Sequence, residues 1–194
     1  METRQVLVLF HDYTSPASAV AIMRLQRLMR EGMSARIRGT EVMALDATLP
    51  VTIDMLAELE AVADEAMAEH IELRRPAAVP PTGLAHVVED VARRHALDMV
   101  WREQCYRAYW SDGANIGDQE QLRRLAERAG LPAGNVDRAL DDRLALLEVR
   151  RRSAGDRRNG IGGVPTIEYN RTLIPGLLPD ADLRALTQLG PAAT

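Results

Sequence analysis

A buried strand that passes directly into a helix is the feature that most constrains the fold of this chain. Residues 6–10 form a continuous apolar run of strand length, which is typical of a strand covered on both faces. From residue 19 to residue 32, apolar side chains recur at helical spacing. Ser15 fits the N-cap of this helix, Pro16 its first position and Ser18 its first turn. The unpaired N–H groups at such a helix start would stabilise an anion, or a thiol that must ionise.

The remaining elements predict an α/β chain with a helical block in its middle. Strands are expected at residues 34–43, 166–169 and 172–174, and helices at residues 52–67, 84–95, 98–110, 118–130, 137–152 and 180–189. The helix that starts at Thr52 would share one apolar face among Ile53, Leu56, Leu59, Val62, Ala63 and Met67. The proline-rich residues 74–83 cannot form a regular helix. This order places residues 48–150 as an all-helical insertion in an α/β layer.

The composition is ordinary for a globular chain and argues against several function classes. The 194 residues carry a net charge of −4, which gives no electrostatic case for binding nucleic acid or an anionic membrane. No apolar run approaches the roughly 20 residues of a membrane span, and no basic and apolar leader precedes the first strand. A cytoplasmic location is therefore expected. The single cysteine, Cys105, permits no intrachain disulfide.

Two short motifs far apart in the chain carry a family resemblance. The tetrad Ser15-Pro16-Ala17-Ser18 follows a strand and an aspartate, and this pattern resembles the DsbA family, whose redox members read Cys-Pro-x-Cys. Its serine form is similar to kappa-class glutathione transferases and 2-hydroxychromene-2-carboxylate isomerases. The second motif, Gly163-Val164-Pro165-Thr166, resembles the family's Gly-Val-Pro-Thr, whose proline is cis and faces the tetrad. Residues 92–98, 106–109 and 131–141 resemble the FrnE-like branch.

The resemblance implies a DsbA-like fold, in which a thioredoxin-like domain carries a large all-helical insertion. Residues 1–47 and 151–194 would form the thioredoxin-like domain, and residues 48–150 the helical insertion domain.

The resemblance also gives Ser15 a role. In the Ser-Pro-x-Ser relatives the first serine donates a hydrogen bond to the sulfur of a bound thiol cofactor, and the helix start lowers the pKa of that thiol. The alternative is that Ser15 only caps its helix and that Ser18 only satisfies backbone in the first turn. A cis Pro165 would leave the N–H and C=O of Val164 free to pair with an extended thiol peptide; the alternative is a structural turn before an edge strand.

The residues around the tetrad complete the expected site. Thiol binding is assigned to Ser15, Val164 and Pro165, catalysis to Ser15 and Ser18, and substrate contacts to Asp12, Tyr13, Ala17 and Thr166. Ala17 replaces the bulky residue usual at its position, which would widen the mouth of the site. Asp12 would set the local charge, or would simply end the strand in a solvent-facing turn.

Histidine and cysteine offer little chemistry outside the tetrad. His11 has no partner that the sequence reveals, and His86, where Pro81 replaces the asparagine of FrnE-like relatives, is expected to be packed or capping. His70 and His95 show no metal-ligand spacing with His86, so no metal is expected. Cys105 lies among aromatic residues and is expected to behave as a small core hydrophobe, with action as a lone redox thiol as the weaker alternative.

Two departures from the family pattern limit the function. With serine at both tetrad positions there is no thiolate to attack a disulfide, so dithiol oxidoreduction through this motif is excluded. Kappa-class relatives hold the γ-glutamyl group with a Ser-Asp pair, whereas this chain reads Gly176-Leu177-Leu178-Pro179, which disfavours glutathione as the thiol.

Two hypotheses remain. One is a transferase or isomerase that depends on a low-molecular-weight thiol, with Ser15 stabilising the bound thiolate. The other is a redox-inactive family member that binds a peptide or small ligand in the groove between the Ser15 helix start and Pro165. The sequence leaves the substrate, the thiol and the oligomeric state open, with a homodimer as one alternative.

Overall fold

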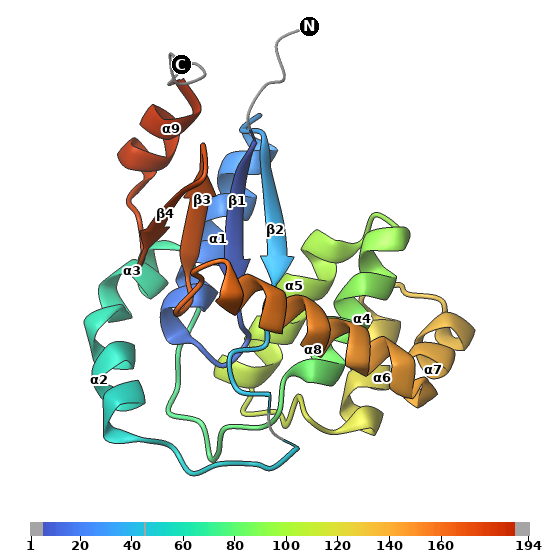
Figure 1. Cartoon of the computed structure of the whole chain (residues 1–194). Coiled ribbons are helices and arrows are strands. Elements are labelled where there is room, and N and C mark those ends of the chain that lie inside the picture. Colours follow the sequence, from blue (N-terminus) through green and yellow to red (C-terminus); the bar gives the residue numbers. More distant parts are fainter. Residues whose placement is uncertain (1–5, 45, 189–194) are drawn as a thin grey trace, which may run out of the picture.

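The fold is organised around a four-stranded mixed sheet (Figure 1). The computed structural model describes residues 6–44 and 46–188. The central strand runs parallel to one neighbour and antiparallel to the other. In sheet order the strands are β2 (Ala35–Gly39), β1 (Leu7–His11), β3 (Thr166–Tyr169) and β4 (Thr172–Pro175). The strand that leads to Ser15 therefore lies in the middle of the sheet.

Two helices cover one face of this sheet. The first, α1 (Pro16–Arg30), begins just beyond the carboxyl end of β1 and packs on Leu7 and Leu9, which are buried. The last, α9 (Asp180–Gln188), lies on the same face, where Leu183 lines a small hollow together with Leu9.

The other helices follow between β2 and β3, as the sequence predicts. They are α2 (Ile53–Ala61), α3 (Ala63–Ala68), α4 (Gly83–Arg94), α5 (Asp98–Trp110), α6 (Gln119–Arg128), α7 (Ala133–Asp141) and α8 (Arg143–Arg158). Figure 1 shows α2 and α3 standing as a separate arm beside α1, while α4 to α7 form a group on the other side. None of the helices within the described residues is long and apolar enough to cross a membrane.

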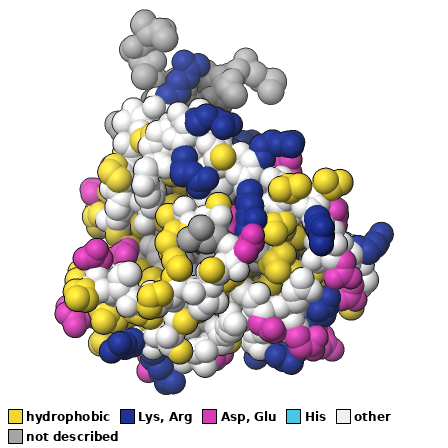
Figure 2. Space-filling view, turned by 60° about the horizontal axis from the view of Figure 1, so that its bottom comes forward, with side chains coloured by type: hydrophobic (Ala, Val, Ile, Leu, Met, Phe, Trp, Pro, Cys, Tyr) yellow, Lys and Arg dark blue, Asp and Glu magenta, His cyan; other side chains and the backbone are white. Residues whose placement is uncertain are grey.

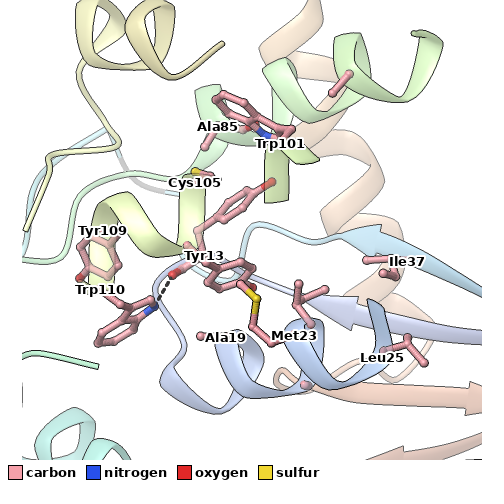
Figure 3. Close-up of a cluster of buried hydrophobic side chains, with 14 of the residues drawn as sticks. Tyr13, Ala19, Met23, Leu25, Ile37, Ala85, Trp101, Cys105, Tyr109 and Trp110 are labelled. Atoms are coloured by element: carbon pink, nitrogen blue, oxygen red, sulfur yellow. Dashed lines mark hydrogen bonds between the residues drawn. The ribbon is translucent and has the colours of Figure 1, made fainter. Parts of the chain in front are cut away.

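A continuous apolar core joins the helical group to the sheet layer. Tyr13, Trp101 and Trp110 are fully buried in it (Figure 3). The indole Nε1 of Trp110 donates a hydrogen bond to the carbonyl oxygen of Tyr13 at 3.0 Å, so α5 is tied directly to the turn between β1 and α1. Because aromatic side chains bury large areas, this junction fixes the helical group against the site.

The structure corrects the predicted strand at residues 34–43. The strand ends at Gly39, because β1 ends at the paired residue His11 and offers no further ladder. Thr40 still donates to the His11 carbonyl, and the N–H of Val42 then turns to the carboxylate of Asp12 (2.7 Å). After Gly39 the chain therefore leaves the sheet, and its backbone donates a hydrogen bond to the Asp12 carboxylate instead.

Two predicted helices are each divided in the structure. The helix at residues 52–67 breaks at Val62, and its predicted apolar face is wrong at both ends, since Ile53 is 84% and Met67 73% exposed. The helix at residues 137–152 breaks at Asp142, whose carboxylate caps the next helix by accepting the Leu144 N–H. Because α8 runs on to Arg158, the expected domain boundary at residue 150 falls inside a helix. The expected end of the last helix, Leu189, lies outside the described residues.

Candidate functional site

Ser15 starts α1 as the sequence predicts. Its backbone is extended, its Oγ accepts the Ser18 N–H at 3.1 Å, and Pro16 occupies the first helical position. Pro16 lacks the N–H that would be unpaired there in any case. The cap leaves Ser15 half-exposed at the end of a buried strand, with the positive end of the helix dipole beside it.

Ser15 also lies directly against Val164. The Ser15 Oγ lies 3.3 Å from the carbonyl oxygen of Val164, although the two residues are 149 positions apart. The Val164–Pro165 peptide bond is cis, which is the isomer that the resemblance implies. The antiparallel pairing of Phe10 with Thr166 holds this segment next to the end of β1. The two distant motifs therefore lie together at the head of α1, as the resemblance requires.

A carboxylate that the sequence did not point to lies at the same helix start. Glu58, on α2, accepts the Ala17 N–H, and its Oε1 lies 3.4 Å from the Ser15 Oγ. The side chain is about half buried, and this burial raises the pKa of Glu58, although hydrogen bonds from Ala17 and Ser15 oppose the rise. A carboxyl group thus already occupies the front of α1.

The other residues expected to contact ligand are largely enclosed. Ala17, Ser18 and Thr166 are at most 7% exposed. The Thr166 hydroxyl donates to the Gly163 carbonyl at 2.7 Å, whereas the Ser18 Oγ has no hydrogen-bond partner within the described part of the chain. The other two residues expected to contact substrate, Asp12 and Tyr13, are buried and point away from the surface. Ser15 and Val164 are therefore the expected site residues whose polar atoms meet at the start of α1.

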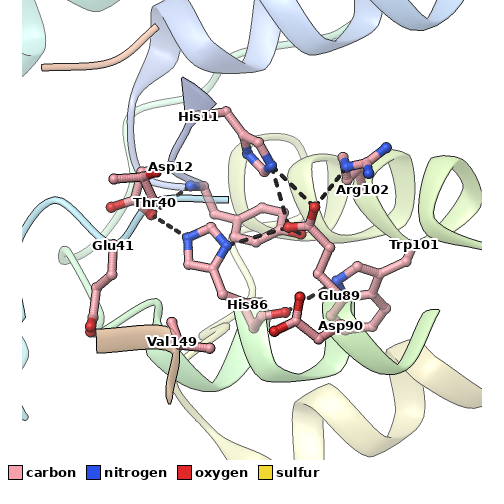
Figure 4. A network of polar contacts seen from close by, with 12 residues as sticks. His11, Asp12, Thr40, Glu41, His86, Glu89, Asp90, Trp101, Arg102 and Val149 are labelled. Atoms are coloured by element: carbon pink, nitrogen blue, oxygen red, sulfur yellow. Dashed lines mark hydrogen bonds and ion pairs between the residues drawn. The ribbon is translucent and has the colours of Figure 1, made fainter. Parts of the chain in front are cut away.

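Asp12 and Tyr13 belong to a buried network of polar groups behind the site (Figure 4). Asp12 accepts the Tyr13 N–H and the Val42 N–H, each at 2.7 Å, and lies 3.3 Å from His86 Nε2. The Tyr13 hydroxyl donates to Glu89 at 2.9 Å. The solvent-facing turn considered for Asp12 is wrong, since its side chain is almost completely buried.

Glu89 is the centre of this network. It lies 3.3 Å from His86 Nδ1 and 3.3 Å from His11 Nε2, and it accepts from Arg102 Nε at 2.9 Å. His11 Nε2 lies opposite Glu89, and Nδ1 lies 2.9 Å from the Tyr106 hydroxyl, which donates to the Asp12 carbonyl oxygen at 3.0 Å. His11 thus has partners that the sequence does not reveal, and His86 is packed, as expected.

The charges of the network balance one another. Burial alone would lower the pKa of His86, but hydrogen bonds to Asp12 and Glu89 outweigh it and raise this pKa to about 9. Burial lowers the pKa of His11, with Glu89 opposing, so this ring is neutral at pH 7. Burial would raise the pKa of Glu89, but His11 and Arg102 hold it well below its usual value. Two cations, His86 and Arg102, thus neutralise the carboxylates of Asp12 and Glu89.

His11, His86 and Glu89 are close enough to share a metal ion, because one ligand atom of each lies within 4.8 Å of the others. Two features disfavour that role. Metal binding needs a neutral His86, which its two carboxylate neighbours oppose. Glu89 is also already paired with Arg102, so a divalent cation would place like charges together. The arrangement is better suited to fixing the turn between β1 and α1.

The sequence contains one weak signal for this network, which is the spacing of His86 and Glu89 on α4. His86 and Glu89 are three residues apart on one helix, so their side chains share a face. Nothing in the sequence, however, shows that this face meets the end of β1. Cys105 is fully buried in the same region, and burial followed by the charge of Glu89 raises its pKa well above normal, which confirms the core interpretation.

The order of the strands, a helix that starts at the end of the central strand and a cis-proline facing that start together define a thioredoxin-like fold. The chain belongs to the DsbA-like thioredoxin domain family, whose model matches residues 6–185. The predicted fold, a thioredoxin-like layer with a large helical insertion, is confirmed. No curated protein matches the chain at a significant level.

Solved structures share this fold at low sequence identity. A probable DsbA oxidoreductase from Streptomyces coelicolor superposes with a TM-score of 0.79 at 22% identity, covering 95% of this chain and 89% of the other. A 2-hydroxychromene-2-carboxylate isomerase gives a TM-score of 0.72 at 19% identity, with 88% of each chain covered. The cytosolic disulfide reductase DsbM from Pseudomonas aeruginosa, solved with glutathione, gives 0.66 at 20% identity, covering 94% of this chain and 93% of the other.

Proposed function

We propose that this protein binds a low-molecular-weight thiol in front of α1 and uses it as a transferase or isomerase. The observation that carries the proposal is the 3.3 Å approach of the Ser15 hydroxyl to the Val164 carbonyl. It brings a hydroxyl donor and the backbone before the cis-proline together at the start of α1. A thiolate there would accept a hydrogen bond from Ser15 and interact with the positive end of α1.

Glu58 would take the proton that the thiol loses. As the thiol enters, its S–H bond breaks, an O–H bond forms on the Glu58 carboxylate, and the thiolate replaces that carboxylate at the start of α1. The half-buried position of Glu58 favours its protonated form, which helps the transfer. The Ser15 hydroxyl, now directed to Val164 or Glu58, would turn to the sulfur.

Relatives support a thiol but do not identify it. An isomerase and a disulfide reductase solved with glutathione have the same fold. The loop at residues 176–179 offers leucines where a γ-glutamyl group needs polar partners, so a thiol other than glutathione is favoured. Because small thiols stay reduced in the cytosol, a cytoplasmic location belongs to the proposal. The FrnE-like branch and a homodimer stay predictions.

The second candidate is a redox-inactive binder of peptides or small ligands. The Val164 N–H makes no hydrogen bond within the described residues, which favours pairing with an extended peptide. The Val164 carbonyl, by contrast, already accepts from Ser15.

A thermal-shift panel of small thiols tests the proposal. A thiol that binds only the native state must raise the unfolding midpoint of the wild type, and Ser15→Ala should lose this rise. Asp118→Ala is the matched control, because it removes the N-cap of α6 far from the groove. If no thiol shifts the wild type, the thiol proposal is wrong.

Turnover separates the two candidates. The transferase or isomerase predicts thiol-dependent conversion of an aryl halide or a cis double bond, lost in Ser15→Ala. Binding of thiols or peptides without any turnover favours the second candidate.

A further inference from the structure

The strand register gathers charged side chains on the sheet face opposite α1. Val8 and Phe10 alternate with the β1 residues that face α1, so they point the other way. Val8 is paired with Arg36 on one side and Glu168 on the other, and Phe10 is paired with Arg38. Figure 1 shows α8 passing in front of this face only near the carboxyl ends of β1 and β2. The rest of the face has no covering helix from the described residues.

A hollow of about 390 Å³ lies on this face. Arg93 of α4 and Arg152 of α8 complete its lining, which also holds Val8, Phe10, Arg36, Ile37, Arg38 and Glu168. Its volume is within the range of ordinary small-molecule sites. Four guanidinium groups and one carboxylate line it, and three of the four guanidinium groups are paired with carboxylates outside the lining. Figure 2 shows dark blue side chains, all arginine because the chain has no lysine, gathered on the upper part of the molecule.

Two of these arginines have unused hydrogen-bond donors. Arg36 is exposed and makes no hydrogen bond or ion pair with any described residue. Arg152 donates from Nη1 to Asp90 at 2.8 Å, but its Nε is buried and has no partner in the described part of the chain. A buried N–H without an acceptor costs free energy, and the part of Arg152 that a ligand in the hollow can reach is the exposed 21% of its side chain.

The other two arginines are only partly engaged. Arg38 binds Asp156, and Arg93 binds Asp90 and Glu89. Each guanidinium has five N–H donors in a planar fork, so donors remain for a further ligand. The Arg38 guanidinium also lies 5.7 Å from the centre of the Phe10 ring, which gives the hollow an apolar floor beside its charges.

We propose that this hollow binds a small phosphoester, whose phosphate contacts Arg36 and Arg152 and whose organic part lies on Val8 and Phe10. A phosphate dianion presents three strong acceptor oxygens to arginine forks. A ligand with a single carboxylate would bring only one negative charge, and its repulsion from Glu168 would largely cancel its attraction to the arginines. The site is on the opposite face of the sheet from α1, so it is separate from the groove beside Ser15.

Titration calorimetry at low salt tests the proposal with adenosine monophosphate, inorganic pyrophosphate and citrate. Adenosine monophosphate should bind to the wild type, and Arg36→Gln should weaken it about tenfold, the usual effect of losing one charged hydrogen bond. Glu168→Gln should tighten binding by removing a repulsion. Arg128→Gln, an exposed arginine on α6, is the matched control and should change nothing.

Ser15→Ala should leave phosphoester binding intact, since that residue is on the other face. The proposal is overturned if adenosine monophosphate gives no heat, or if Arg36→Gln and Arg128→Gln behave alike. Equal binding of citrate would overturn the assignment to a phosphoester, and binding of pyrophosphate alone would overturn the role of Val8 and Phe10.

Discussion

The Oγ of Ser15 lies 3.4 Å from a carboxylate oxygen of Glu58, a residue 43 positions further along the chain. Because Glu58 also accepts the Ala17 N–H, the protein without ligand already holds a carboxyl group at the start of α1. A thiolate and a carboxylate at one helix start repel each other, so one of them must carry a proton. A bound thiol and Glu58 would therefore share a single proton.

The change Glu58→Gln should alter how many protons are released when a thiol binds. In the wild type at pH 7, Glu58 takes up the proton that the thiol loses, so binding releases almost no protons to the buffer. In Glu58→Gln the proton has no acceptor, and about one proton per thiol should reach the buffer. Calorimetry in two buffers with different ionisation enthalpies measures this number.

Glu60→Gln is the control for that measurement, since Glu60 is an exposed residue on the same helix. Proton release by the wild type would contradict the role of Glu58 while leaving thiol binding intact. The absence of any thiol binding would instead contradict the proposed function.

Cys105 should not react with a thiol reagent in the folded protein. Its side chain is fully buried, and burial together with the charges of Glu89 and Asp12 raises its pKa well above normal. Because the thiolate is the reactive form, an aromatic disulfide should label the chain only after unfolding. Labelling in guanidinium provides the control and should give one thiol per chain. Rapid labelling of the native protein would contradict the core interpretation and would favour Cys105 as a lone redox thiol.

The fold was largely predictable because its signals are local or are carried by motifs. The apolar run of β1, the cap at Ser15 and the hairpin at Asn170–Arg171 each depend on neighbours in sequence. The breaks at Val62 and Asp142 were missed because helical periodicity continues across them. At Asp142 the signal is the local cap that its carboxylate forms with the Leu144 N–H, which the continuing periodicity conceals.

The candidate site was only half predictable. Ser15 and Val164 belong to two recognisable motifs, whereas Glu58 lies in a helix of ordinary amphipathic pattern and belongs to no motif. His11 was left without a partner because Glu89 is 78 positions away. Contacts between an insertion and a sheet depend on how the two parts pack, and a single sequence contains no signal for that packing.

The charge of His86 should make stability depend on pH. Its pKa rises from 6.5 in the unfolded chain to about 9 in the folded protein, because the hydrogen bonds to Asp12 and Glu89 outweigh burial. A group with a raised pKa stabilises fully below its unfolded pKa, and the effect is lost as the pH rises through the folded pKa. The free energy of unfolding should therefore fall by about 3 kcal/mol between pH 6.5 and pH 9.

Denaturant titrations of the wild type and His86→Asn over this range measure the effect. His86→Asn should be destabilised most at pH 6.5 and should lose most of the slope. His70→Asn is the control, because His70 is exposed and its positive φ of 56° suits asparagine. A wild-type curve that is flat from pH 6.5 to 9 would contradict the charged state of His86.

The last residue of β2 should tolerate no side chain, because the buried network lies directly against it. A Cβ on Gly39 would come within 2.3 Å of His86 Nδ1 and 2.9 Å of Glu89 Oε2. Gly39→Ala must push His86 away from its partners, so it should cost about 2 kcal/mol, as overpacking of a core does, and should also flatten the pH dependence. Gly134→Ala on α7 is the matched control: a Cβ there meets nothing within 4 Å, and alanine should stabilise that helix by up to about 1 kcal/mol. Equal unfolding midpoints for the two variants in denaturant would mean that β2 and α4 are not packed through His86.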